Sequence, residues 1–236
     1  MALKDLSTID MYLKRWILEA SLSVEHSLKV NLLKDIQERG IDEFDIVANY
    51  LIKYPKIKDE IKSRRNTPYV KNLLSKYKHP YYPIWVYLEV IPFGEFVNFY
   101  KYYCDEHSCG EFSSDLLYNV KSIRNASAHN NCVIHDLVNK NGYYKIELVD
   151  ILDPILPDTK RRTIQDRLKN NSVQDFISLL IAVNTILKSD ELKTDHLKSI
   201  RNLFYGRMIR NSTLYKSSTA LNQMYEFCKK VVDNLQ

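Results

Sequence analysis

The chain has 236 residues and a net charge of +5, and it contains only 5 glycines and 7 prolines. This length can bury a hydrophobic core without disulfide bonds or metal sites, and the scarcity of glycine and proline favours long helices over tight-turned β structure. The mild positive charge permits a polyanionic partner but excludes a histone-like nucleic-acid binder.

The cysteines and the first residues bear on the compartment. The chain has 4 cysteines, and residues 1–5 carry no secretory signal. We therefore expect free thiols in the reducing cytoplasm. The most apolar stretch, 173–187, is broken by polar side chains, so we expect no membrane span and no membrane partner.

Two helices are predicted at the N-terminal end. A hydroxyl cap at Ser7 and Thr8 and an acid at Asp10 indicate a helix start. Helically spaced apolar residues then predict a helix of roughly thirty residues that ends near Gly40. A second helix is predicted over 41–54, where Pro55 closes it.

A basic segment with interleaved tyrosines follows over 56–78. One interpretation is a solvated, partly disordered connection, as most charge runs are. The other is a phosphate-binding rim, because lysine and arginine supply most contacts to nucleic-acid backbones. The second interpretation makes four residues candidate RNA contacts: Lys62, Arg64, Arg65 and Lys71.

An aromatic stretch comes next and predicts buried core. Pro83 can begin a helix, Pro92 and Gly94 interrupt it, and a further helix is predicted over 96–106. We expect Glu89, which lies within this apolar setting, to need a basic partner.

The polar motif of greatest interest is Arg124-Asn125-Ala126-Ser127-Ala128-His129. It lies at the predicted C-terminal end of a helix capped by Ser113 or Ser114. Arg124 and His129 are about 140° apart around a helix, so they do not share a stripe, whereas Asn125 and His129 do. Such a pair can also arise by accident on a solvated helix.

The remainder of the chain is predicted to be mainly helical. A turn over 140–143 and a weak alternation over 144–149 allow one short β-hairpin near 143–149. The predicted helices that follow cover 158–168, 172–187, 190–204 and 217–235. We therefore expect residues 1–236 to form a single, mainly α domain.

Several enzyme templates are absent from the chain. It has no glycine-rich phosphate loop, nucleophile elbow or H-E-x-x-H helix, and we expect no cofactor. A zinc site could combine Cys104, His107 and Cys109 with Cys132 and His135. The spacing is unlike common zinc motifs, so free thiols are the favoured alternative and no metal is expected.

The Arg124–His129 pair suits RNA cleavage without a metal. In that reaction the ribose 2′-hydroxyl attacks the adjacent phosphorus, and histidine can remove or supply the protons. Arginine can bind the phosphate oxygens as their negative charge grows, and Asn125 could orient either group. A single histidine per chain is too few for both proton transfers, so the pattern favours a two-fold homodimer.

Three segments resemble the Abi-like family of bacterial abortive-infection proteins, of the AbiD/AbiF type. They are the first helix over 9–36, the P-x-W-x-x-x-E…F-G pattern over 83–94, and the R-N-x-x-A-H motif over 124–129. The resemblance covers residues 8–138. It implies the HEPN superfamily and therefore a HEPN-type helical bundle with additional N-terminal helices.

By this resemblance, Arg124 and His129 form a catalytic pair, Asn125 assists, and RNA is cleaved to a cyclic phosphate at a composite dimer site. The chain departs from the family after the motif: Asn130, Asn131 and Cys132 stand where a second histidine and its neighbours are common. This departure makes substrate placement the open point. Asn130 and Asn131 remain candidate RNA contacts.

The leading hypothesis from the sequence is a metal-independent HEPN endoribonuclease in abortive infection or phage defence. The rival hypothesis is a non-catalytic RNA-binding or scaffold dimer in a defence or toxin–antitoxin system. The basic segment and the departures after His129 motivate this rival. In either case RNA is the expected partner, as substrate or regulator, and an RNA or protein antitoxin could restrain the protein.

Overall fold

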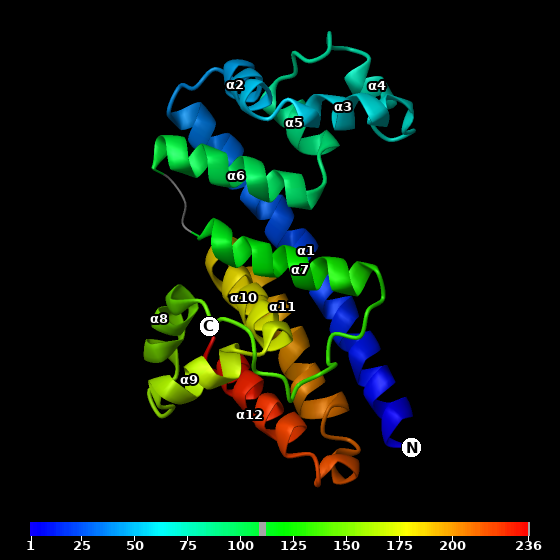
Figure 1. Ribbon diagram of the computed structural model, residues 1–236, viewed down its shortest axis with the longest axis vertical. Coiled ribbons are helices and arrows are strands. Elements are labelled where there is room, and N and C mark those ends of the chain that lie inside the picture. Colours follow the sequence, from blue (N-terminus) through cyan, green and yellow to red (C-terminus); the bar gives the residue numbers. More distant parts are fainter. Residues whose placement is uncertain (109–111, 236) are drawn as a thin grey trace. The chain divides into compact units, whose positions relative to one another are not determined.

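The computed structural model describes residues 1–108 and 112–235. These residues form α-helices joined by short 3-10 and π segments, and they include no β-strand (Figure 1). The predicted mainly α class is therefore confirmed. The chain divides into two compact units: unit 1 comprises Met1–Val24 and Glu111–Gln236, and unit 2 comprises Glu25–Gly110.

The first helix, α1 (Ala2–Glu38), contributes core residues to both units. Ile17 and Val24 are buried in its first part, and Leu32 in its second. The helix begins at Ala2, earlier than predicted. Thr8 does not cap it, because its hydroxyl donates to the carbonyl of Lys4 within the second turn. Asp10 therefore lies within the helix, about two turns past its start, and not at its N-terminus.

Unit 2 is held together by aromatic side chains. Its helices after α1 are α2 (Asp45–Lys53), α3 (Lys56–Ser63), α4 (Lys71–Leu74), α5 (Ile84–Val90) and α6 (Phe93–His107), with a 3-10 turn η1 (Arg64–Asn66). Tyr50 of α2 packs edge-on against Phe99 of α6, with ring centroids 5.0 Å apart. Such pairs add to the free energy gained by burying the rings. The aromatic stretch is thus core, as predicted.

The acid that contacts this aromatic core is Glu95 and not Glu89. Glu89 is exposed on α5 and needs no basic partner. Glu95, in the first turn of α6, accepts hydrogen bonds from the hydroxyls of Tyr50 at 2.7 Å and Tyr87 at 3.3 Å. Burial, with Glu95 nearby, raises the pKa of Tyr87 far above its usual range. The prediction for Glu89 was wrong because the helix turns that side chain to solvent.

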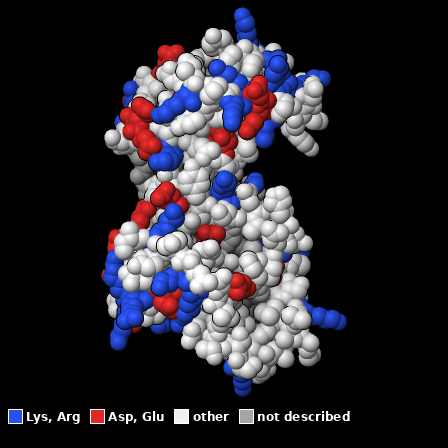
Figure 2. Space-filling model, viewed as in Figure 1, with Lys and Arg blue, Asp and Glu red and all other residues white. Residues whose placement is uncertain are grey.

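The basic segment of unit 2 is structured. Three short helical pieces, α3, η1 and α4, cover most of it, because Ile57, Ile61 and Leu74 are buried beneath the charged surface. The interpretation as a disordered connection therefore does not hold for these pieces. Lysine and arginine side chains gather over this part of unit 2 in Figure 2, with acidic side chains beside them.

Unit 1 is built around two helices that lie side by side, α7 (Ser114–Ala128) and α10 (Asn171–Ile186) (Figure 1). The amide of Asn119 donates to the hydroxyl of Ser178 at 3.0 Å in their buried contact. Most of α10 is buried, as expected of a helix that is apolar nearly all round. Around them lie α8 (Ile146–Ile155), α9 (Arg161–Leu168), α11 (Asp190–Asn202), η2 (Leu203–Arg207), η3 (Ser212–Tyr215) and α12 (Thr219–Asn234).

The short β-hairpin near 143–149 is not formed. Helix α8 begins at Ile146, and its buried residues Leu148, Val149 and Leu152 follow helical spacing. The N–H of Lys145, just before the helix, donates to the side-chain oxygen of Gln174 at 2.7 Å. Six residues of weak alternation are too few to separate a strand from one face of a helix.

A buried carboxylate fixes the start of α1 in unit 1. Asp5 accepts hydrogen bonds from Tyr215 at 2.6 Å, Arg207 at 2.5 Å and Asn211 at 2.8 Å. The bond from Tyr215, followed by those from Arg207 and Asn211, outweighs burial and lowers the pKa of Asp5 to about 2. These contacts hold the first turns of α1 against the 207–215 segment.

Candidate functional site

The Arg–His motif ends helix α7 in a defined cap. His129 is the last residue of near-helical conformation, and Asn130 follows with φ = +58°. The N–H of Asn130 donates to the carbonyl of Ser127 at 3.1 Å, and the N–H of Asn131 donates to that of Ala126 at 2.8 Å. This is the Schellman arrangement, in which asparagine is the residue next best to glycine at the left-handed position.

His129, at the end of this helix, is exposed to solvent. The side chain of His129 is exposed and makes no hydrogen bond or ion pair within the described residues. Arg124 and Asn125 are half-buried, and the guanidinium of Arg124 donates to the side-chain oxygen of Asn125 at 3.0 Å. No carboxylate of the described residues pairs with Arg124. A buried, acid-paired arrangement, which would have made this motif purely structural, is therefore not present.

The segment after His129 is fastened to α1 by Asp10, which is only 4% exposed. One carboxylate oxygen accepts the backbone N–H groups of Val133 at 2.7 Å and Ile134 at 3.3 Å. The other oxygen lies 2.8 Å from the ammonium of Lys14, which also donates to the side-chain oxygen of Asn130 at 2.6 Å. The buried charge is thus fully compensated, as a buried carboxylate must be.

Sequence reasoning missed Asp10 and Lys14 as members of this site. The available signal was their spacing, since an acid and a lysine four residues apart share one face of a helix. That spacing is common on helices and does not indicate a contact with residues more than a hundred positions later. The predicted contact Asn130 is used by the fold as a cap and as the acceptor for Lys14, whereas Asn131 is exposed.

The residues considered for zinc do not form a metal site within the described part of the chain, where no group of three or more His, Cys, Asp or Glu side chains is placed to hold a metal ion. His135 donates from its ring to the backbone carbonyl of Cys132 at 2.6 Å. Burial and the neighbouring Asp10 raise the pKa of the Cys132 thiol. Cys109 lies outside the described residues.

The other four predicted RNA contacts belong to unit 2. Lys62, Arg65 and Lys71 are exposed, whereas Arg64 is half-buried and donates to the carbonyl of Val90 at 2.9 Å. Burial, then the charges of Arg65 and Lys62, lower the pKa of His79. The charge of Asp59 acts in the opposite direction, so the cations around this imidazole have an acidic neighbour.

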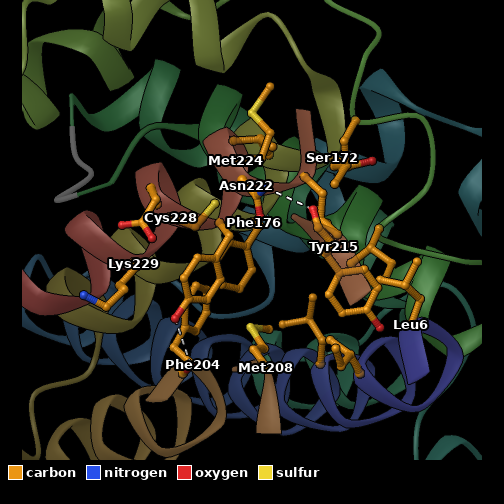
Figure 3. Close-up of a pocket in the computed structure, with 18 of the residues that line it drawn as sticks. Leu6, Ser172, Phe176, Phe204, Met208, Tyr215, Asn222, Met224, Cys228 and Lys229 are labelled. Carbon is orange, nitrogen blue, oxygen red and sulfur yellow. Dashed lines mark hydrogen bonds between the residues drawn. The ribbon is translucent and has the colours of Figure 1, made fainter. Parts of the chain in front are cut away.

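Unit 1 also contains an apolar cavity of about 380 Å³. Figure 3 shows Phe176, Phe204, Met208 and Met224 among the side chains around it. Ile134, from the segment after His129, contributes to the lining. The lining of this cavity is mostly apolar and contains no histidine or arginine, so the Arg–His end of α7 is the better candidate site for cleavage of a phosphodiester.

Comparison with protein families gave one match. A model of the Abi-like protein family matches residues 2–135, which include α1, all of unit 2 that is described, and the whole Arg–His motif. Comparisons with curated proteins and with solved structures gave no match. Within the described residues, no helix has both the length and the apolar character that crossing a bilayer requires.

Proposed function

The chain belongs to the Abi-like protein family, and from this premise we propose that it is a metal-independent endoribonuclease of the HEPN type that acts in abortive infection. Its substrate is RNA, and its working form is a homodimer that brings two copies of the Arg–His motif together. The single observation that supports this proposal best is the exposed His129 at the end of α7, with no partner in its own described chain, beside a half-buried Arg124.

The proposed reaction needs only groups that the chain supplies. One imidazole takes the proton of the ribose 2′-hydroxyl, and the hydroxyl oxygen forms a bond to the neighbouring phosphorus. The bond from phosphorus to the 5′-oxygen of the next nucleotide breaks, and the second copy of His129 donates a proton to that oxygen. The products are a 2′,3′-cyclic phosphate and a free 5′-hydroxyl.

Arg124 stabilises the charge that grows on the non-bridging phosphate oxygens. A guanidinium has five N–H donors in a planar fork, and the bond to Asn125 uses one of them. Asn125 in this account is a positioning residue, because it holds the guanidinium without needing to touch the substrate. This hydrogen bond orients the guanidinium before RNA binds, and a preoriented donor favours electrostatic stabilisation of a transition state.

The whole chain is proposed to act as one domain. Because α1 contributes buried residues to both units, separating the units would divide the hydrophobic surface of one helix. We therefore expect one cooperative unfolding transition, with the same midpoint when it is measured by circular dichroism and by tyrosine fluorescence. Two separate transitions would contradict this.

The test of the catalytic proposal is RNA cleavage by purified protein in excess EDTA. We expect the unaltered chain to cleave, and Arg124→Ala and His129→Ala each to lose cleavage while keeping the helical circular dichroism spectrum. Ser122→Ala, on the same helix, is the control, since its exposed hydroxyl bonds only to the carbonyl of Tyr118. Activity that requires added metal, or that survives both substitutions, would refute the proposal.

The second candidate is a non-catalytic RNA-binding dimer in a defence or toxin–antitoxin system. The exposed cations of the basic segment, among them Lys62 and Arg65, favour it. In this case RNA copurifies with the protein, raises the 260/280 absorbance ratio, and remains intact after long incubation. Substitution of Lys62 and Arg65 would then remove the bound RNA, whereas substitution of His129 would not.

A further inference from the structure

A surface groove lies directly beside the residue that follows His129. It has a volume of about 630 Å³ and runs between the first turns of α1 and the 130–134 segment, both within unit 1. Its lining includes Met11 and Lys14 from α1, and Asn130 and Cys132 from the segment after the motif. Because Asn130 is adjacent to His129 in the chain, the groove lies next to the proposed active site.

Asp10 and Lys14 are the charged residues that line the groove, and they form an ion pair, so its attraction for an anion comes from hydrogen-bond donors. The carboxylate of Asp10 is buried and already accepts two backbone N–H groups and the ammonium of Lys14. That ammonium makes two contacts, to Asp10 and Asn130, and therefore keeps a third N–H for a ligand. The amide N–H₂ of Asn130 has no acceptor in the described residues and adds two more donors.

An aromatic ring and a second cation continue the groove along α1. Tyr12 and Arg15 are exposed, and the guanidinium of Arg15 lies over the Tyr12 ring at 5.6 Å from its centroid. Tyr12 is four residues after Thr8, and Arg15 four after Met11, so each lies one turn beyond a residue that lines the groove. An exposed tyrosine beside arginine and lysine is the combination that proteins use to stack bases and hold the backbone of single-stranded nucleic acids.

We propose that this groove is a subsite for single-stranded RNA, and that it binds the nucleotides next to the scissile phosphate. Lys14 and Arg15 contact phosphate oxygens, Asn130 contacts a phosphate or base, and Tyr12 stacks on a base. This proposal rests on the proposed function, because it takes the Arg–His motif as the place of cleavage. It also gives Asn130 a role in binding beside capping α7 and accepting from Lys14.

The test uses the full chain and a short, fluorescein-labelled RNA in which every 2′-hydroxyl is methylated, so that binding is measured without cleavage. We expect Tyr12→Ala and Arg15→Ala each to weaken binding about 5- to 10-fold in fluorescence anisotropy, and the Arg15→Ala variant to lower the salt dependence. Lys198→Ala is the matched control, because Lys198 is an exposed cation of unit 1 on another helix, α11. The RNA affinity of this variant should be unchanged. Unchanged affinity in Tyr12→Ala and Arg15→Ala would overturn the subsite.

A second readout uses the cysteine in the groove. Cys132 is exposed there, whereas Cys228 is buried. We expect the methylated RNA to slow iodoacetamide alkylation of Cys132, measured by peptide mapping, with Cys104 as the internal reference in unit 2. Equal alkylation of Cys132 with and without bound RNA would contradict the subsite. Protection of Cys132 without cleavage of ordinary RNA would support RNA binding in the groove but refute the nuclease, so failure of the nuclease can be told apart from failure of the groove to bind RNA.

Discussion

The end of α7 and the basic segment of unit 2 both carry residues suited to RNA, but the fold treats them differently. At the end of α7 the polar groups are few: Asp10 and the Asn130 cap fix the backbone after the helix, a hydrogen bond to Asn125 orients Arg124, and the side chain of His129 is exposed. In the basic segment the cations are numerous, and Lys62, Arg65 and Lys71 project from short helices into solvent. A positioned guanidinium beside an exposed imidazole suits chemistry, and a group of exposed cations suits non-specific attraction to a polyanion.

The largest effect that this comparison predicts is on the rate of cleavage. His129→Ala should lower kcat about 100- to 10,000-fold, because it removes both proton transfers in a dimer while leaving the backbone cap intact. The measurement is single-turnover cleavage of a labelled RNA. A loss found only in KM would place His129 in binding and would remove the contrast between the two regions.

The next effect concerns the anchor beneath the site. Asp10→Asn keeps the shape but cannot accept from Lys14 and from two backbone N–H groups at once, so it should lower the free energy of unfolding by about 2–4 kcal/mol. Urea unfolding measures this change. The control is Asp105→Asn in unit 2, which breaks an exposed pair with Lys101 at the same four-residue spacing and should cost at most about 1 kcal/mol. Equal costs would show that Asp10 is no anchor.

A pH dependence follows from Asp5. Its pKa is lowered from 3.8 to about 2, mainly by the hydrogen bond from Tyr215. The folded state therefore binds this proton more weakly than the unfolded state, so the stabilisation is present above pH 3.8 and is lost as the pH falls toward 2. Asp5→Asn should lower the free energy of unfolding at pH 6 and flatten its fall between pH 4 and pH 2, compared by urea unfolding. If the free energy of unfolding fell equally with pH in both proteins, groups other than Asp5 would cause the acid sensitivity.

The basic segment should affect affinity and not chemistry. Replacing Lys62, Arg65 and Lys71 together by alanine should weaken RNA binding about 10-fold at low salt and reduce the salt dependence of binding, with kcat unchanged. Anisotropy titrations at several salt concentrations measure the first two quantities. If kcat falls with affinity, the segment belongs to the reaction and the two regions are not distinct in role.

The smallest effect separates the two roles of Asn130. Because its φ is +58°, Asn130→Ala should cost about 1 kcal/mol of stability, whereas Asn130→Gly should be nearly neutral. Both variants lose the contact with Lys14. If RNA affinity falls in both while stability falls only in Asn130→Ala, the side chain acts in binding as well as in capping. Unchanged RNA affinity in Asn130→Gly would restrict Asn130 to capping.

The sequence was most informative where a periodic pattern was long. The apolar stripe of α1 and the strongly apolar α10 each span several turns, so their helical state followed from the length of the pattern. Over 144–149 only six residues were available, and the prediction failed. The burial of Glu89 was predicted wrongly for a related reason, because aromatic neighbours in the sequence do not indicate which face of a short helix is buried.

The site was predictable only in part. Arg124, Asn125 and His129 are adjacent in sequence and lie on one helix end, so their proximity follows from local geometry. The contribution of Asp10 and Lys14 depends on a contact with residues 130–134, which no local pattern encodes. The left-handed conformation of Asn130 was predictable to an intermediate degree, since asparagine after a helix is a known signal for that cap.

The central claim, 2′-hydroxyl attack without a metal, is tested most directly by the ends of the RNA products. In EDTA, the account predicts 2′,3′-cyclic phosphate and 5′-hydroxyl ends by mass spectrometry. It also predicts no cleavage at a position where a single 2′-deoxynucleotide replaces the ribonucleotide 5′ to the scissile phosphate. Products with 3′-hydroxyl and 5′-phosphate ends, or cleavage at the deoxy position, would contradict it.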